Sequence, residues 1–274
     1  MGFIAVECLL DPRLDAYRDL PNAKVSQESD DFIAESRTVV QRLLKTPLEI
    51  KSIVCSEKSK HELTDVAAQR PEIPIFVVPY QRLKDLIGFK LHRGMLACAG
   101  RPKSPSVASL VETSAPTDTI VICPQIADPV NLAGVIRNCA AFGVGGLIIG
   151  AHSCMPYSRR VVRVSMGTIF HLPIRVTDDL ATDLRALHSE FRYTTVGTVL
   201  TSDAIPIVTA ERPRRLAILF GSENDGIDEQ WISLCDQKVT LPMRKGTDSL
   251  NVATATGVFL YHYTHVARNV AASD

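Results

Sequence analysis

The chain has no long hydrophobic run and no paired cysteine motif. No apolar stretch approaches the roughly 18 residues that a membrane-spanning helix needs. The seven cysteines never show the CxxC spacing of a zinc knuckle, and several lie inside apolar runs, where cysteine is usually a small buried hydrophobe. The first residues also lack the basic and apolar regions of a signal peptide. These absences predict a protein without a bound metal or a membrane span, working in a reducing cytoplasm.

An excess of charge of either sign is also missing. Lysine and arginine total 30, as do aspartate and glutamate, so the formal net charge is zero. This balance excludes a uniformly basic nucleic-acid-binding coat, but it leaves room for a local basic patch. Two short runs could form one: residues 158–167, with Arg159, Arg160 and Arg163, and residues 88–94, with Lys90, His92 and Arg93. Solvent exposure is the commoner explanation of such runs, and contact with RNA phosphates is the more specific one.

The pattern of apolar residues divides the chain into two α/β domains. Residues 1–102 form the first expected domain, residues 103–118, rich in Pro, Ser and Thr, form a linker, and residues 119–274 form the second. In the first domain, an apolar stripe over residues 32–44 predicts a helix. The other elements expected there are strands at 50–55, 73–78 and 94–100 and helices at 58–69 and 81–87.

The second domain alternates strands and helices throughout. We expect strands at 119–123, 146–149, 174–176, 193–196, 216–220 and 238–241, and helices at 132–142, 179–190, 229–234 and 252–266. Strands that are separated by helices favour a parallel sheet covered on both faces. Such sheets bind ligands at the carboxyl ends of their strands, and three polar motifs fall there.

The first motif opens the helix expected at 132–142. Asn131 has a side chain that can cap this helix, and Arg137 lies within its otherwise apolar sequence. The simpler interpretation is a cap and an arginine that points into solvent. The functional interpretation has Arg137 holding a phosphate or ribose oxygen at the edge of the sheet. The nearby glycines of GVGG follow a helix instead of a strand, which argues against a nucleotide-dependent oxidoreductase.

The second and third motifs follow the strands expected at 216–220 and 238–241. GSENDGI places Glu223 in a glycine-flanked turn that could admit a ligand closely, although an ordinary solvated turn would use the same residue types. TDSLNV places Ser249 or Asn251 as the cap of the helix at 252–266. Simple capping explains this third motif, and orientation of a substrate hydroxyl explains it about equally well.

Together, the three motifs resemble those of a known enzyme family. Residues 119–267 are similar to the SpoU/TrmH family of S-adenosylmethionine-dependent RNA 2′-O-methyltransferases, in the SPOUT superfamily. The likeness rests on Asn131 and Arg137 in N-x5-R, on Glu223 within GSENDG, and on Ser249-Leu250-Asn251 after LPM. Residues 11–99 resemble, more weakly, the ribosomal-protein-like RNA-binding domain of the family. One departure is Ser36, because the family commonly has Glu-Gly where this chain has Glu35-Ser36.

The resemblance implies a fold and a cofactor that composition could not reveal. The C-terminal domain would be a SPOUT α/β domain with a parallel sheet and a deep trefoil knot, and S-adenosylmethionine would bind in the knot. By motif position, the loops that hold this cofactor would include Thr198, Gly221, Leu241 and Leu250. The family implies a homodimer with the active site near its interface. A separate N-terminal domain favours ribosomal over transfer RNA as the substrate, and methylases that confer antibiotic resistance share this layout.

The resemblance also assigns catalytic roles. Arg137 would act on the ribose hydroxyl as a general base or as an anchor of the forming alkoxide and the adjacent phosphate; because arginine keeps its proton in proteins, the second role is equally sound. Asn131 would position Arg137 or the ribose, Glu223 would orient the arginine, and Ser249 and Asn251 would complete the pocket. Methyl transfer from a sulfonium removes charge, so no metal is required. The alternative is a catalytically silent RNA-binding protein on the same fold, which would not need the full set.

Overall fold

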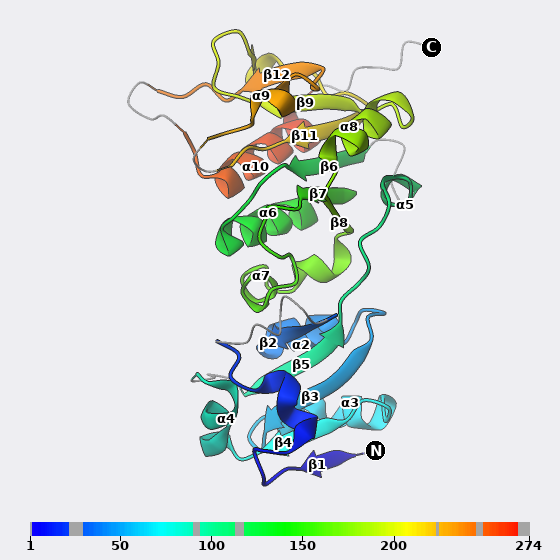
Figure 1. Ribbon diagram of the computed structural model, residues 1–274, viewed down its shortest axis with the longest axis vertical. Helices are drawn as coiled ribbons and strands as arrows, with labels where there is room; N and C mark the ends of the chain where they lie inside the picture. The colour runs from blue at the N-terminus through cyan, green and yellow to red at the C-terminus, as the bar shows by residue number, and fades with distance from the viewer. Residues whose placement is uncertain are drawn as a thin grey trace. The chain divides into compact units, whose positions relative to one another are not determined.

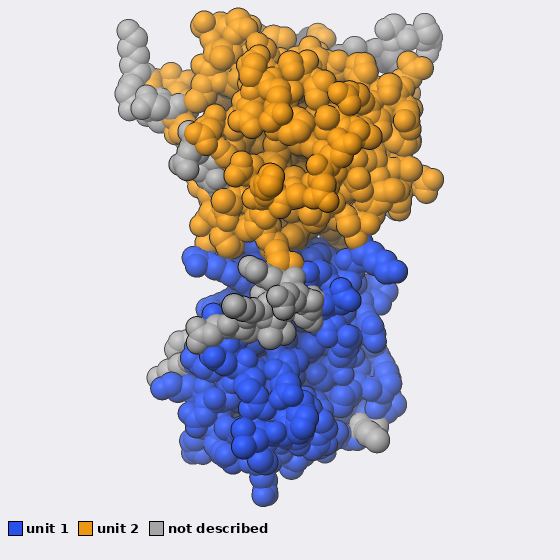
Figure 2. All heavy atoms as spheres, viewed as in Figure 1, with its two compact units in different colours: residues 1–103, 157–170 blue, residues 104–156, 171–274 orange. Residues whose placement is uncertain are grey.

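The computed structural model describes residues 2–21, 30–89, 94–112, 118–222, 225–244 and 249–267. The chain divides into two compact units, which Figure 2 shows in different colours. Unit 1 consists of residues 1–103 and 157–170, and unit 2 consists of residues 104–156 and 171–274. Within the described ranges, no helix has the length and apolar character to cross a membrane.

Unit 1 is built on a mixed five-stranded sheet in the order β1-β4-β3-β5-β2 (Figure 1). Its strands are β1 Phe3–Ala5, β2 Asp31–Glu35, β3 Ile50–Ser56, β4 Ile75–Val78 and β5 Met95–Gly100, and its connecting helices are α2 Arg37–Leu43, α3 Thr64–Gln69 and α4 Tyr80–Ile87. Strands β1, β4 and β3 run parallel, whereas β5 runs antiparallel to both β3 and β2. The strands and helices expected between residues 50 and 100 are all present.

The prediction of a helix over residues 32–44 is wrong for the first residues of that range. Residues 31–35 form β2, and the helix begins only at Arg37. Ser36 separates the two elements with a φ of 91°, a backbone conformation that residues other than glycine rarely adopt. The local apolar pattern failed here because β2 hydrogen-bonds along its whole length to β5, which lies far along the chain.

Unit 1 also contains residues 157–170, which the expected domain boundaries place in the second domain. These residues include α7 (Arg159–Val164), which packs against β2. The ring of Phe32 on β2 lies 5.2 Å from the ring of Tyr157 and 5.6 Å from that of Phe170, measured between centroids. The sequence did not reveal this arrangement, because a local apolar pattern does not say which of two sheets a segment will cover.

Ion pairs hold the same segment on β2. The carboxylate of Glu35, whose side chain is only 4% exposed, lies 2.5 Å from Nη1 of Arg159 and 3.1 Å from Nη1 of Arg163. The guanidinium of Arg159 also lies over the ring of Phe89, 4.5 Å from its centroid. Two arginines of the basic run at 158–167 are therefore engaged inside unit 1, while Arg160 is exposed. The second basic run is not testable in the same way, because Lys90, His92 and Arg93 lie outside the described residues.

Unit 2 is built on a seven-stranded sheet in the order β10-β12-β9-β11-β6-β7-β8 (Figure 1). The strands are β6 Asp118–Cys123, β7 Gly146–Gly150, β8 Ile174–Thr177, β9 Thr194–Thr198, β10 Ile205–Pro206, β11 Arg215–Leu219 and β12 Gln237–Thr240. The helices are α5 Val107–Glu112, α6 Pro129–Ala141, α8 Leu180–Ser189, α9 Glu229–Ile232 and α10 Val252–Tyr261, with a π-helix at His262–Val266 after α10. Every neighbouring pair of strands is parallel, which confirms the expected α/β domain with a parallel sheet.

Helices cover both faces of this sheet. Leu110 of α5 and Leu184 of α8 share a hydrophobic core with Ile120 of β6. Because side chains alternate along a strand, Cys123 of β6 faces the other side, where it lies near Cys139 of α6; burial raises the pKa of the Cys139 thiol well above its usual value. The expected linker at 103–118 thus contains a helix, α5, that belongs to the core of unit 2. The sequence did not predict this helix, because its apolar residues are few and lie within a segment rich in Pro, Ser and Thr.

Candidate active site

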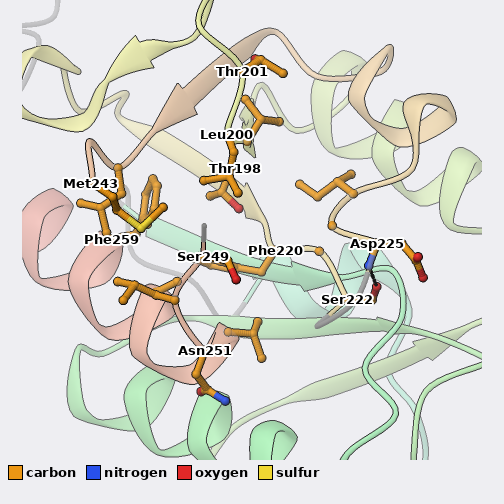
Figure 3. Close-up of a pocket in the computed structure, with 18 of the residues that line it drawn as sticks. Thr198, Leu200, Thr201, Phe220, Ser222, Asp225, Met243, Ser249, Asn251 and Phe259 are labelled. Atoms are coloured by element: carbon orange, nitrogen blue, oxygen red, sulfur yellow. Dashed lines mark hydrogen bonds between the residues drawn. The ribbon is translucent and has the colours of Figure 1, made fainter. Parts of the chain in front are cut away.

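A cavity of about 460 Å³ lies at the carboxyl ends of β9, β11 and β12, which are neighbours in the sheet of unit 2 (Figure 3). The loops after these strands line it together with α9 and one side of α10. The lining residues are Thr198, Val199, Leu200, Thr201, Phe220, Gly221, Ser222, Asp225, Gly226, Ile227, Ile232, Leu241, Met243, Ser249, Leu250, Asn251, Val252, Ala255 and Phe259. This is the sheet edge at which a parallel α/β domain is expected to bind a ligand.

The walls of the cavity are mainly apolar, with a few hydroxyl and amide groups. The rings of Phe220 and Phe259 pack edge to face with their centroids 5.7 Å apart. The hydroxyl of Thr198 donates a hydrogen bond of 2.8 Å to the carbonyl of Leu219, at the end of β11. Asp225 is the one ionisable side chain among the described lining residues. The size and the sparse polar groups are typical of a site for an organic small molecule, for which volumes of about 300–1,000 Å³ are common.

A closed turn forms the wall after β11. The amide of Ser222 donates to the carbonyl of Gly226 over 2.8 Å, and the amide of Asp225 donates to the hydroxyl of Ser222 over 3.1 Å. Gly221 cannot carry a side chain here, because a Cβ would lie 2.1 Å from the carbonyl carbon of Gly226. Glycine is therefore required at position 221 for the close approach of two backbone segments. The predicted catalytic residue Glu223 lies outside the described residues.

The third motif forms the mouth of α10. The Oδ1 atom of Asn251 accepts hydrogen bonds from the amides of Ala253 (3.0 Å) and Thr254 (3.4 Å), so Asn251 caps the helix. Of the two caps that the sequence allowed, Ser249 or Asn251, the structure selects Asn251. Both residues line the cavity, and Figure 3 shows them between the loop after β12 and the first turn of α10.

The four predicted cofactor-binding residues come together around this cavity. Thr198, Gly221, Leu241 and Leu250 lie in four different segments of unit 2, and each of them lines the cavity. Their contact with a cofactor stays a prediction. The grouping follows from the parallel sheet, since the ends of β9, β11 and β12 all reach the same edge.

Asn131 does not cap α6, and that part of the prediction is wrong. The cap is Asp128, whose Oδ1 atom accepts from the amides of Val130 (2.7 Å) and Asn131 (2.9 Å). Pro129 occupies the first helical position, where its fixed φ suits the helix and its missing N–H is not needed. The helix thus begins three residues earlier than expected, and the side chain of Asn131 is available for another contact. Its Oδ1 atom accepts a hydrogen bond of 2.8 Å from Nδ2 of Asn251.

Arg137 is exposed on α6 and is not among the residues that line the cavity in the described part of the chain. The structure therefore brings Asn131, Ser249 and Asn251 together at the cavity and leaves Arg137 facing outward on the neighbouring helix. An exposed guanidinium can reach a large polyanionic substrate, whereas it would not contact a ligand buried in the cavity.

One residue of this region was not predicted. Nδ2 of Asn138 donates to the carbonyl of Ala253 on α10 over 2.5 Å. The sequence carried a signal for it, because residues 131, 134 and 138 recur at helical spacing as small or amide side chains within an apolar helix. Within the described ranges, no group of three or more His, Cys, Asp or Glu side chains lies close enough together to hold a metal ion.

Comparison with known proteins agrees with this geometry. The model of the SpoU rRNA Methylase family matches residues 118–261. An uncharacterized tRNA/rRNA methyltransferase of Mycobacterium tuberculosis is 33% identical over 266 residues, which cover 95% of this chain and 91% of the relative. The 23S rRNA (guanosine-2′-O-)-methyltransferase RlmB of Acinetobacter baylyi is 30% identical over 183 residues, 65% of this chain and 73% of the relative.

A solved structure shares the fold along nearly the whole chain. The AdoMet-bound rRNA methyltransferase of Sinorhizobium meliloti superposes with a TM-score of 0.80 at 24% identity, covering 95% of this chain and 97% of that one. The matched region at 118–261 holds the cavity, the turn after β11 and both helices that carry the predicted catalytic residues. This chain belongs to the SpoU rRNA methylase family.

Proposed function

We propose that this protein transfers a methyl group from S-adenosylmethionine to a ribose 2′-hydroxyl of ribosomal RNA. The observation that carries the proposal is the convergence of three distant motifs on one cavity. Gly221 and Asn251 line the cavity, and Asn131 is hydrogen-bonded to Asn251. The similarity to RlmB, whose name specifies 23S rRNA and guanosine 2′-O-methylation, supports the substrate class.

The cavity fits the proposed cofactor. Its apolar walls suit a nucleoside and a thioether-like chain, and the bare backbone at Gly221 admits a ligand to the turn after β11. Thr198, Gly221, Leu241 and Leu250 would hold S-adenosylmethionine, largely through backbone groups. When bound, the cofactor supplies a methyl group on a positively charged sulfur.

The residues outside the cavity would act on the RNA. Arg137, exposed on α6, would hold the phosphate next to the reacting ribose and stabilise the oxygen as it loses its proton, or would itself take up that proton as the general base. Asn131 and Asn251 would keep α6 and α10 together at the mouth of the cavity, and Ser249 would contact the ribose from the loop before α10. Glu223 would orient Arg137.

We further propose that the protein is a homodimer. Val130 of α6 and Val258 and Tyr261 of α10 are exposed large apolar side chains on the two helices that carry the first and third motifs, and Val266 of the π-helix extends this apolar set. Exposed large apolar side chains on neighbouring helices are often covered by a protein partner. A second copy seated there would lie next to Arg137, as the family resemblance leads us to expect.

The remaining features of the proposal rest on the resemblance. They are a deep trefoil knot in the C-terminal part of unit 2, an RNA-binding role for unit 1, and a cytoplasmic location. The seven cysteines form no disulfide, which supports a reducing compartment.

Isothermal titration with S-adenosylmethionine and with its demethylated product, S-adenosylhomocysteine, tests the proposal. We expect saturable binding of both ligands, with one site per chain. Absence of binding by the folded protein would contradict the proposal and favour a catalytically silent RNA-binding protein instead.

A further inference from the structure

Helices α6 and α10 meet along a line of small and amide side chains. On α6 the line consists of Asn131, Gly134 and Asn138, which recur at three- and four-residue spacing and so share one face of the helix. At one end, Nδ2 of Asn251 donates to Oδ1 of Asn131 over 2.8 Å. At the other end, Nδ2 of Asn138 donates to the carbonyl of Ala253 over 2.5 Å. The two helices are therefore joined by a side-chain hydrogen bond at each end of the line.

Between these bonds, the helices approach too closely for larger side chains. A Cβ on Gly134 would lie 2.6 Å from Cβ of Ala253, and a Cβ on Gly257 would lie 3.3 Å from Nδ2 of Asn138. A methyl added at position 257 would therefore press on the amide of Asn138, which would have to give by a few tenths of an ångström.

The bond from Asn138 ends on the part of α10 that shapes the site. Ala253 lies in the first turn of the helix, and its own amide donates to the cap residue Asn251 over 3.0 Å. Asn251 and Val252, just before it, both line the cavity. On the other helix, Asn138 follows Arg137 directly. One hydrogen bond therefore connects the backbone next to the cavity with the turn of α6 that carries the exposed arginine.

We infer that Asn138 is a positioning residue for methyl transfer: it fixes the placement of α6 against the first turn of α10, and so the distance from Arg137 to the mouth of the cavity. This inference rests on the proposed function. Asn138 is half-buried and does not line the cavity, so it touches neither cofactor nor reacting atoms. Its effect is on the geometry of the reaction and not on the affinity for the cofactor.

The test compares Asn138→Asp and Asn138→Ala with the unaltered full-length chain. Aspartate keeps the shape of asparagine but replaces the donating amide with a carboxylate, which cannot donate to the Ala253 carbonyl. We expect both variants to bind S-adenosylmethionine within about twofold of the unaltered protein in isothermal titration. Their single-turnover rate of methyl transfer to unmodified ribosomal RNA, at saturating cofactor and RNA, should fall by about tenfold to a hundredfold, the loss expected from a misplacement of about 1 Å.

Two further variants separate positioning from stability. Gly257→Ala keeps the Asn138 side chain but adds a methyl 3.3 Å from its Nδ2 atom, and we expect a smaller fall in rate with the same cofactor affinity. Ile148→Val removes one methylene from the buried core that β7 shares with α5 and α8; it should lower the melting temperature and leave the single-turnover rate unchanged.

The outcomes distinguish this inference from the proposed function. If the unaltered protein neither binds S-adenosylmethionine nor transfers methyl groups, the proposed function fails. If the unaltered protein is active and Asn138→Asp reacts at the same rate, the hydrogen bond does not position Arg137 and the inference is overturned. It is also overturned if the rates of all four variants simply follow their melting temperatures.

Discussion

The two sheets of this protein differ in the directions of their strands and in what covers them. In unit 2 every strand runs parallel, so the loops after β9, β11 and β12 gather around one cavity. In unit 1, β5 runs against its neighbours, so the loops are divided between the two ends of the sheet, and edge strand β2 is covered by residues 157–170. Strand direction thus accounts for the gathering of loops around one site in unit 2, whereas the packing surface of unit 1 depends on the side chains of Phe32 and Glu35.

The largest effect should come from closing the cavity of unit 2. In Gly221→Ala the added methyl would lie 2.4 Å from the amide nitrogen of Ile227, so the turn after β11 must move. We expect S-adenosylmethionine to bind at least about a hundredfold more weakly in isothermal titration, equivalent to about 2.7 kcal/mol. Gly2→Ala, at a position with open space around it, is the matched control and should bind normally. Equal affinities for the two variants would place the cofactor elsewhere.

The next largest effect is expected at Arg137, on the exposed face of α6, where a substitution should slow the reaction without weakening cofactor binding. Arg137→Lys keeps the positive charge but loses the planar fork that can hold two oxygen atoms. We expect turnover on RNA to fall by roughly a hundredfold, as when a single transition-state donor is removed, with no change in cofactor affinity. Arg185→Lys, at an exposed position on α8, is the control. Near-normal turnover of Arg137→Lys would remove this residue from the catalytic set.

A smaller effect is expected at the covered edge of unit 1. Glu35→Gln removes the charge that two arginines share, and the loss of a charged hydrogen bond should lower the free energy of unfolding by roughly 2 kcal/mol. Urea denaturation measures this change. Glu72→Gln breaks the exposed pair between Glu72 and Arg70 and should leave the urea midpoint almost unchanged. If the two variants lose the same stability, Glu35 does not anchor the segment at 157–170.

The smallest effect concerns the turn between β2 and α2. Ser36 has a φ of 91°, which costs about 1–3 kcal/mol for a residue with a side chain. Ser36→Gly should therefore stabilise the protein by about 1 kcal/mol, after the greater flexibility of glycine in the unfolded chain is subtracted. Ser36→Ala keeps a Cβ and should give no such gain. A destabilised Ser36→Gly variant, measured in the same urea titration, would show that the serine side chain contributes more than the backbone conformation costs.

Local sequence patterns predicted most of unit 2, because each of its strands is a buried apolar run bounded by turn residues. The same patterns failed at residues 31–35, where pairing with β5 overrides the helical spacing, and at α7, which packs on β2 although more than a hundred residues separate them in the chain. The cap of α6 was misplaced because Asp128 and Pro129 together form a stronger start than Asn131. The first two errors come from contacts between distant segments, and the third from a local signal that was misread.

The sequence motifs predicted which residues gather at the site, but they did not predict the hydrogen bonds that join its helices. Motif position grouped Thr198, Gly221, Leu241 and Leu250, and the parallel sheet brings them to one cavity. The bond between Asn131 and Asn251 and the bond from Asn138 to Ala253 depend on how closely two helices approach. Gly134 permits that approach and Gly257 leaves room beside Asn138; both stand out in the sequence only as poor helix formers.

The most direct test of ribose methylation is to supply the protein with S-adenosylmethionine labelled in its methyl group and with unmodified ribosomal RNA, and then to digest the RNA in alkali. Alkali cleaves RNA only next to a free 2′-hydroxyl. We predict that the label will be recovered in alkali-resistant dinucleotides, and that Arg137→Lys will incorporate far less of it. Label recovered in mononucleotides would show that a base is methylated instead, and would contradict the proposed transfer to a ribose hydroxyl.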